Sequence, residues 1–61
     1  MTVKIIYKGE GIIDFLGDRH KGLTVANAKG VRIVNDILII DIKNHENFNE
    51  NLNDIESIEI K

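Results

Sequence analysis

Few residues in this chain have side chains that could perform catalysis or bind a metal ion, and they are scattered. The chain of 61 residues has no cysteine, which removes a thiol nucleophile, a disulfide framework and a thiolate zinc site. His20 and His45 are the only two histidines, and neither repeats the ligand spacing of a metal site. Two solvated loop histidines are therefore favoured over a metal centre.

The remaining polar residues give little support for acid–base or nucleophilic catalysis. Asp14 and Asp41 each interrupt an apolar stretch, but we expect both on the outer faces of strands, where a carboxylate also discourages edge pairing. Ser57 is the only serine and lies outside any glycine-bracketed turn. The five glycines are scattered singly and form no phosphate-binding loop. We therefore expect a protein that is not an enzyme, with no catalytic residues, no cofactor and no metal.

The segment from 17 to 22 is polar, is bracketed by glycines and predicts a loop with three potentially cationic side chains in a row. Such a loop could contact phosphates or an acidic protein surface. No aromatic side chain lies within it to stack on a base, so a solvated loop is favoured and nucleic-acid binding is the alternative function. The residues of that alternative, with two further bases downstream, are Arg19, His20, Lys21, Lys29 and Arg32.

Length and charge limit the classes of protein to which the chain can belong. A chain this short holds one small domain, residues 1–61, and a hydrophobic content of 43% is too high for a disordered segment. Eight basic against ten acidic residues leave a net charge of −2, which is unlike a general nucleic-acid binder. Residues 1–30 carry a balance of +2 and residues 31–61 a balance of −4.

The composition also suggests a source and a compartment. Twelve Ile, seven Asn and six Lys have A/T-rich codons, which is typical of a low-GC bacterium or one of its phages. The longest apolar run, residues 37–40, is far shorter than the roughly 20 residues that cross a bilayer. The first residues lack the charged and apolar regions of a signal peptide, so we expect a cytoplasmic protein.

Alternating β-branched residues predict strands in the first half of the chain. Residues 2–8 alternate apolar and polar side chains around Val3, Ile5 and Tyr7, a period typical of a half-buried strand. A glycine-rich turn follows. Residues 11–16 are therefore predicted to form a second strand that makes a hairpin with the first.

The centre of the chain predicts three strands joined by tight turns. Residues 23–27 form the first of these, and residues 28–30 fit a three-residue hairpin connection with glycine in its left-handed position. Residues 31–34 and 37–43 form the next two strands. The pair Asn35-Asp36 lies between them and tolerates left-handed backbone, so it predicts a two-residue hairpin.

The last third of the chain is richer in asparagine and predicts a long loop before a closing strand. Asparagine competes with the backbone for hydrogen bonds, so residues 44–53 are predicted to be a loop, with Phe48 folding back onto the core. The apolar residues from Leu52 to Ile58 recur every third position, which suits one 3₁₀ turn before a strand that ends at Ile60. A carboxy-terminal helix over residues 51–61 is the weaker alternative.

Five or six short strands joined by tight turns predict an all-β fold, a small antiparallel barrel with a 3₁₀ turn before the last strand. This plan resembles SH3-like barrels, in which a polar loop follows an early strand and a 3₁₀ turn precedes the final one. The resemblance is one of architecture, so it transfers no functional residue to this chain. The chain has only three aromatic side chains, Tyr7, Phe15 and Phe48, too few for the aromatic groove of SH3 domains.

Several predicted strands carry apolar groups on both faces, more than the single interior of a small barrel can bury. Exposed apolar patches usually mark interaction surfaces. We therefore expect a non-enzymatic interaction module that self-associates or binds a partner protein through an apolar strand face, as an accessory protein of a phage or mobile element would. The residues predicted to form this face are Ile6, Ile13, Val34, Ile37 and Ile39.

Overall fold

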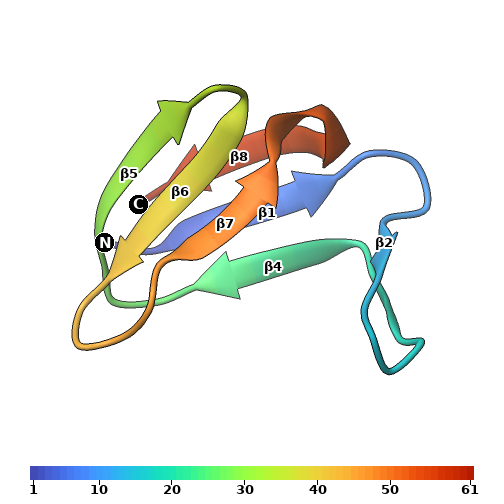
Figure 1. The fold of residues 1–61 in the computed structure, drawn as a ribbon, viewed down its shortest axis with the longest axis horizontal. Helices are drawn as coiled ribbons and strands as arrows, with labels where there is room; N and C mark the ends of the chain where they lie inside the picture. The colour runs from blue at the N-terminus through green and yellow to red at the C-terminus, as the bar shows by residue number, and fades with distance from the viewer.

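Strands and one 3₁₀ turn make up all the regular structure of the chain, whose 61 residues are all described by the computed structural model (Figure 1). The strands are β1 (Val3–Tyr7), β2 (Ile12–Ile13), β3 (Arg19–His20), β4 (Gly22–Val25), β5 (Ala28–Val34), β6 (Ile37–Ile42), β7 (Phe48–Asn51) and β8 (Ile55–Ile60). The 3₁₀ turn η1 (Leu52–Asp54) immediately precedes β8. No helical segment has the length and apolar character needed to cross a membrane.

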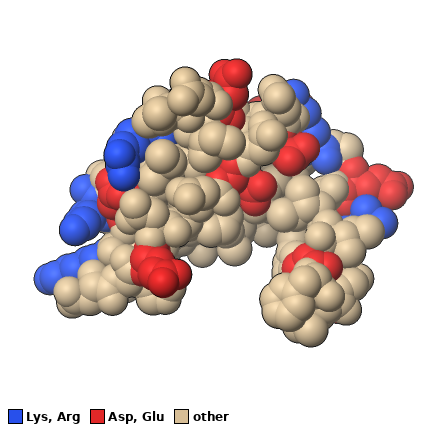
Figure 2. All heavy atoms as spheres, in the orientation of Figure 1, with Lys and Arg blue, Asp and Glu red and all other residues tan.

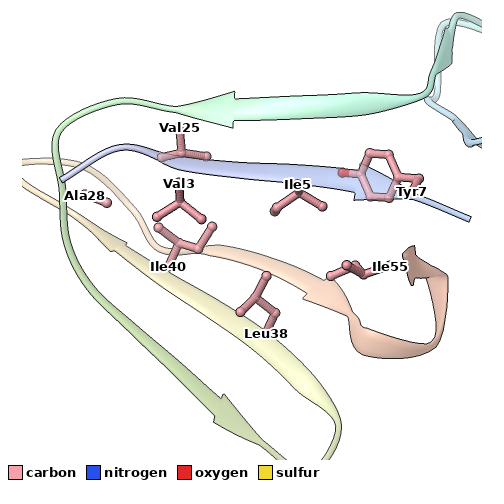
Figure 3. Close-up of a cluster of buried hydrophobic side chains, with 8 residues drawn as sticks. All are labelled: Val3, Ile5, Tyr7, Val25, Ala28, Leu38, Ile40 and Ile55. Atoms are coloured by element: carbon pink, nitrogen blue, oxygen red, sulfur yellow. The ribbon is translucent and has the colours of Figure 1, made fainter. Parts of the chain in front are cut away.

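The strands pair into three small antiparallel sheets, in the orders β4-β1-β8, β5-β6-β7 and β2-β3. The all-β prediction is therefore confirmed. A closed barrel is not found, because the two three-stranded sheets remain open and enclose the core between their inner faces (Figures 1 and 3).

The core is built from the alternating faces of the two central strands. Val3, Ile5 and Tyr7 of β1 are buried, while the residues between them are exposed. On β6, Leu38 and Ile40 are buried against them, as the alternation of a half-buried strand requires. Figure 3 shows all eight buried residues in one cluster, which also contains Val25, Ala28 and Ile55. Phe48 packs against this cluster, as predicted from its isolation among asparagines.

Two predicted turns are confirmed by their backbone geometry. Asn35 and Asp36 have φ of 51° and 64° and join β5 to β6 as a two-residue hairpin. The predicted 3₁₀ turn forms as η1, where the side chain of Asn51 accepts a hydrogen bond of 2.9 Å from the N–H of Asn53. The alternative of a carboxy-terminal helix over residues 51–61 is wrong, because β8 completes the sheet beside β1.

The predicted hairpin between residues 2–8 and 11–16 is wrong. Both edges of β1 are occupied by the distant strands β4 and β8, so the next segment has no place beside it. Only Ile12 and Ile13 of that segment form a strand, and they pair with β3. β3 lies inside residues 17–22, which were predicted to be a loop.

Two further boundaries differ from the prediction. Residues 28–30 do not connect a hairpin, because the chain turns at Asn27, with φ of 60°, and Ala28 is already buried in β5. Gly30 lies instead at a bulge of β5, where an added Cβ would approach the Asp41 carboxylate to 3.4 Å. Within the predicted loop of residues 44–53, residues 48–51 form β7, which pairs with β6 and directs its asparagines outward.

A hydrogen bond joins the two sheets at the end of β1. The buried Tyr7 hydroxyl donates to Oε2 of Glu50, on β7, at 3.0 Å. Burial, this hydrogen bond and the negative charge of Glu50 together raise the pKa of Tyr7 from 10.0 to about 12. The neutral phenol is therefore the form that the folded protein holds.

Because of the hydrogen bond between Tyr7 and Glu50, we expect the free energy of unfolding to decrease at alkaline pH. The folded pKa of Tyr7 lies above the unfolded one, so its contribution is complete below pH 10 and is lost as the pH rises to about 12. Replacing Tyr7 by Phe should cost about 1–2 kcal/mol at neutral pH and remove this part of the pH dependence. Urea unfolding of both proteins across this range measures the difference, and parallel pH curves would contradict the assignment.

Candidate functional site

A small hairpin, residues 11–21, projects from the body of the molecule and is named the arm here (Figure 1). Its strands β2 and β3 pair only with each other, Ile12 with His20 and Ile13 with Arg19. At its base Gly11 has φ of +90°, and a Cβ there would overlap the carbonyl oxygen of His20. Only glycine at position 11 therefore allows the two strands of the arm to approach each other this closely.

The tip of the arm, residues 14–18, is fixed by one carboxylate. Oδ1 of Asp14 accepts hydrogen bonds of 2.9 Å from the N–H groups of both Leu16 and Asp18. The backbone adds two more, from the N–H of Asp14 to the Asp18 oxygen at 2.9 Å and from the N–H of Gly17 to the Asp14 oxygen at 3.0 Å. Gly17 takes the left-handed conformation, with φ of +88°. The tip is therefore a turn of defined shape.

The second oxygen of the same carboxylate ties the tip to the returning strand. Oδ2 of Asp14 lies 2.7 Å from Nε2 of His20. This hydrogen bond, followed by the backbone bond from Asp18, lowers the pKa of Asp14 below its ordinary value of 3.8. At neutral pH Asp14 is consequently a full carboxylate that holds both the turn and the strand.

The tip displays the most exposed large apolar side chains of the molecule. Phe15 is 96% exposed and Leu16 72% exposed, and Ile13 of β2, which immediately precedes the tip, is 57% exposed. In Figure 2 the arm forms the lower right lobe, whose surface is mostly uncharged. An apolar knob of this kind on a defined turn is typical of a surface that another molecule covers.

The five residues predicted to form one partner-binding face lie on three separate surfaces. Ile6 is on the outer face of the sheet β4-β1-β8, and Ile13 is on the arm. Val34, Ile37 and Ile39 share the outer face of the sheet β5-β6-β7, where Ile37 and Ile39 are half-buried. The structure therefore brings together three of the five and separates the other two.

The predicted basic site is divided and mostly paired with acids. On the arm, Nη1 of Arg19 lies 3.3 Å from the carbonyl oxygen of Glu10 and 3.7 Å from its carboxylate, and His20 is bound to Asp14. Arg32 lies on β5, 3.4 Å from Asp41. Lys21 follows β3 and Lys29 lies on β5, both exposed and without an ion pair. The positive charges therefore do not form one surface.

The other polar residues singled out in the sequence are in ordinary surroundings. Nδ1 of His45 lies 3.2 Å from the carbonyl oxygen of Glu46 in the β6–β7 loop. No group of three His, Asp or Glu side chains is placed to hold a metal ion. No enclosed pocket is found in the structure.

Sequence reasoning missed Phe15 and Leu16, because apolar residues after Ile12 and Ile13 were interpreted as the continuation of a strand. The signal that could have located the tip is the spacing of Asp14, Gly17 and Asp18. An aspartate followed three residues later by glycine is typical of a turn closed by the Asp side chain.

Comparison with protein-family models, with curated proteins and with solved structures gives no match to this chain. The comparisons therefore assign no family and no function to the chain.

The role of Asp14 is testable with two matched substitutions. Asp14→Ala removes the acceptor of both N–H groups, so hydrogen exchange at the Leu16 and Asp18 amides should accelerate while the amides of β6 remain protected. Asp14→Asn keeps a carbonyl oxygen at this position and should largely preserve the slow exchange. In the wild type, the same amides should lose protection only as the pH falls below 3.8, through the lowered pKa of Asp14. Equal protection in the wild type and the Ala variant would show that the tip does not depend on Asp14.

Proposed function

We propose that this protein is a non-enzymatic interaction module that binds a partner protein through the tip of the arm. The observation that carries the proposal is the combination of a turn fixed by Asp14 with a nearly fully exposed Phe15 and an exposed Leu16. This proposal keeps the interaction function expected from the apolar surplus and assigns it to the arm instead of a strand face.

The energetics of the tip favour a role in binding. Burying a Phe or Leu side chain contributes about 1.5–3 kcal/mol each, and aromatic anchors are enriched among the residues that dominate protein interfaces. Because the turn is already ordered, little backbone entropy is lost when a partner covers it. The tip therefore fits an apolar depression on a protein surface.

The charges around the tip favour a protein partner over a lipid surface. Two acidic residues, Asp14 and Asp18, flank the two apolar side chains. A segment that inserts into an anionic membrane usually carries Lys or Arg beside its apolar residues. The Lys and Arg residues nearest the tip in sequence are Arg19, which is paired with Glu10, and Lys21.

The order of the elements supports an SH3-like description of the module. The arm follows the first long strand, the chain passes from one sheet to the other at Asn27, and η1 precedes the last strand. In this description the two three-stranded sheets are halves of an open barrel, with β1 between the second and last main strands. The arm then occupies the position of the polar loop that follows the early strand.

Affinity capture from the source cell with matched variants tests the function. The double variant Phe15→Ser/Leu16→Ser should lose a partner that the wild type retains, with binding of the purified pair weakened by about a hundredfold or more. Ile33→Ser is the control, because Ile33 is 56% exposed but lies on β5 away from the arm. Both variants should keep the stability of the wild type, since the replaced side chains are exposed.

Salt dependence separates this function from the nucleic-acid alternative. Binding through an apolar tip should change little with added salt, whereas phosphate contacts weaken steeply. Oligonucleotide binding that is lost in Arg19→Glu/Lys21→Glu and kept in the Phe15→Ser/Leu16→Ser variant would overturn the proposal.

A further inference from the structure

The two three-stranded sheets have four edge strands, and three of them carry protective features. β5 and β8 each contain a bulge, and the extra residue at the bulge is charged, Lys29 in β5 and Glu56 in β8. β7 consists of asparagines and Glu50 besides its single Phe48. Charges and bulges on edge strands prevent pairing with other chains.

The fourth edge strand, β4, has none of these features. Its sequence is Gly-Leu-Thr-Val, with no charge and no proline, and its register with β1 is regular throughout. Leu23 is half-buried and Thr24 is exposed. β4 is therefore the only edge of these two sheets that is not protected by charge or by irregular geometry.

The free side of β4 presents unpaired backbone groups. The N–H of Tyr7 donates to the oxygen of Lys21 at 2.9 Å, and antiparallel pairing alternates residue by residue from that point. The backbone N–H and C=O groups of Leu23 and Val25 therefore point toward β1, while those of Gly22 and Thr24 point away from the sheet. The backbone groups of Gly22 and Thr24 make no hydrogen bond to any segment on the side of β4 that faces away from β1. Outward donors and acceptors in this pattern match an extended backbone.

The space beside the free edge of β4 can accommodate one extended polypeptide segment. In the view of Figure 1 the arm and the β6–β7 loop, residues 43–47, project beyond the two ends of this strand. Figure 2 shows the molecule hollowed between these two projections. Four residues of strand span about 13 Å. A second copy pairing through its own β4 would bring its own arm and loop into the same space, whereas a single extended segment would not.

We propose that the free edge of β4 binds a short extended segment of a partner polypeptide as an added strand. This proposal rests on the proposed function and adds a second contact to the arm. Apolar and polar residues alternate along the expected segment. An apolar residue lies beside the half-buried Leu23 on the core side, and a polar residue lies beside Thr24 on the outer side. Gly22 and Thr24 offer at most about four backbone hydrogen bonds, and in the proposed function the arm tip supplies a second contact with the same partner.

Two substitutions of Thr24 test the edge without changing the arm. Thr24→Pro removes the outward N–H, which makes no bond to β1, and Thr24→Val removes only the hydroxyl group. Linear peptides selected from a random displayed library on the wild type should bind the Val variant equally and the Pro variant at least about tenfold more weakly. Urea unfolding of both variants reports whether the fold is retained.

Hydrogen exchange provides a test that needs no variant. In the complex of the wild type with a selected peptide, the Thr24 amide should exchange much more slowly, because it then donates to the added strand. A library that yields no binder, an unchanged Thr24 amide, or equal binding to a folded Pro variant would overturn the edge proposal. Dimerisation of the chain that is abolished by Thr24→Pro would overturn it as well, since the occupant would then be a second copy.

The same peptides distinguish this proposal from the proposed function. Peptides that bind the Pro variant normally and fail on Phe15→Ser/Leu16→Ser would leave the arm as the binding site and remove the edge. Peptides with the reverse behaviour would support the edge and contradict the role of the arm tip.

Discussion

The contact between β1 and β6 is the packing interaction on which the rest of the structure depends. Each is the central strand of its sheet, and five of the eight buried side chains belong to these two strands. Val3, Ile5, Leu38 and Ile40 are fully buried (Figure 3). In so short a chain the larger part of the fully buried apolar surface that offsets chain entropy lies at this contact. The neighbouring strands are ordered because they pair with strands that this contact already fixes.

The arm is the part of the molecule that this contact does not order. Except for the half-buried Ile12 at its base, no residue of the arm packs against the core, and its strands join neither large sheet. Its shape comes instead from local polar bonds converging on Asp14. These bonds order the backbone of the tip without covering its apolar side chains. The tip is therefore both ordered and apolar on its surface.

The sequence predicted well those elements whose cause is local. The alternation around Ile5, the left-handed pair Asn35-Asp36 and the spacing of Leu52 and Ile55 each identified the correct element. The errors arose where the deciding fact is distant in the chain. Residues 11–16 carry a strand pattern, but both edges of β1 are taken by strands that come later.

The candidate site was harder to predict for the same reason. An apolar pattern shows that residues avoid water, but it does not show which of them find a partner within the fold. Ile6, Ile13 and Ile39 look alike in the sequence, yet they lie on different surfaces. Phe15 resembles a core aromatic until the position of the arm is known.

Exposure alone does not identify a binding surface, because single exposed apolar residues are ordinary in folded proteins. Ile33 and Ile60 are more than half exposed at the ends of edge strands, where incomplete coverage follows from their position. Phe15 and Leu16 differ from these, because a dedicated carboxylate fixes the backbone that presents them. The apolar side chains of this turn remain in water, so they contribute no burial energy to folding. In the proposed function, a partner protein supplies their burial.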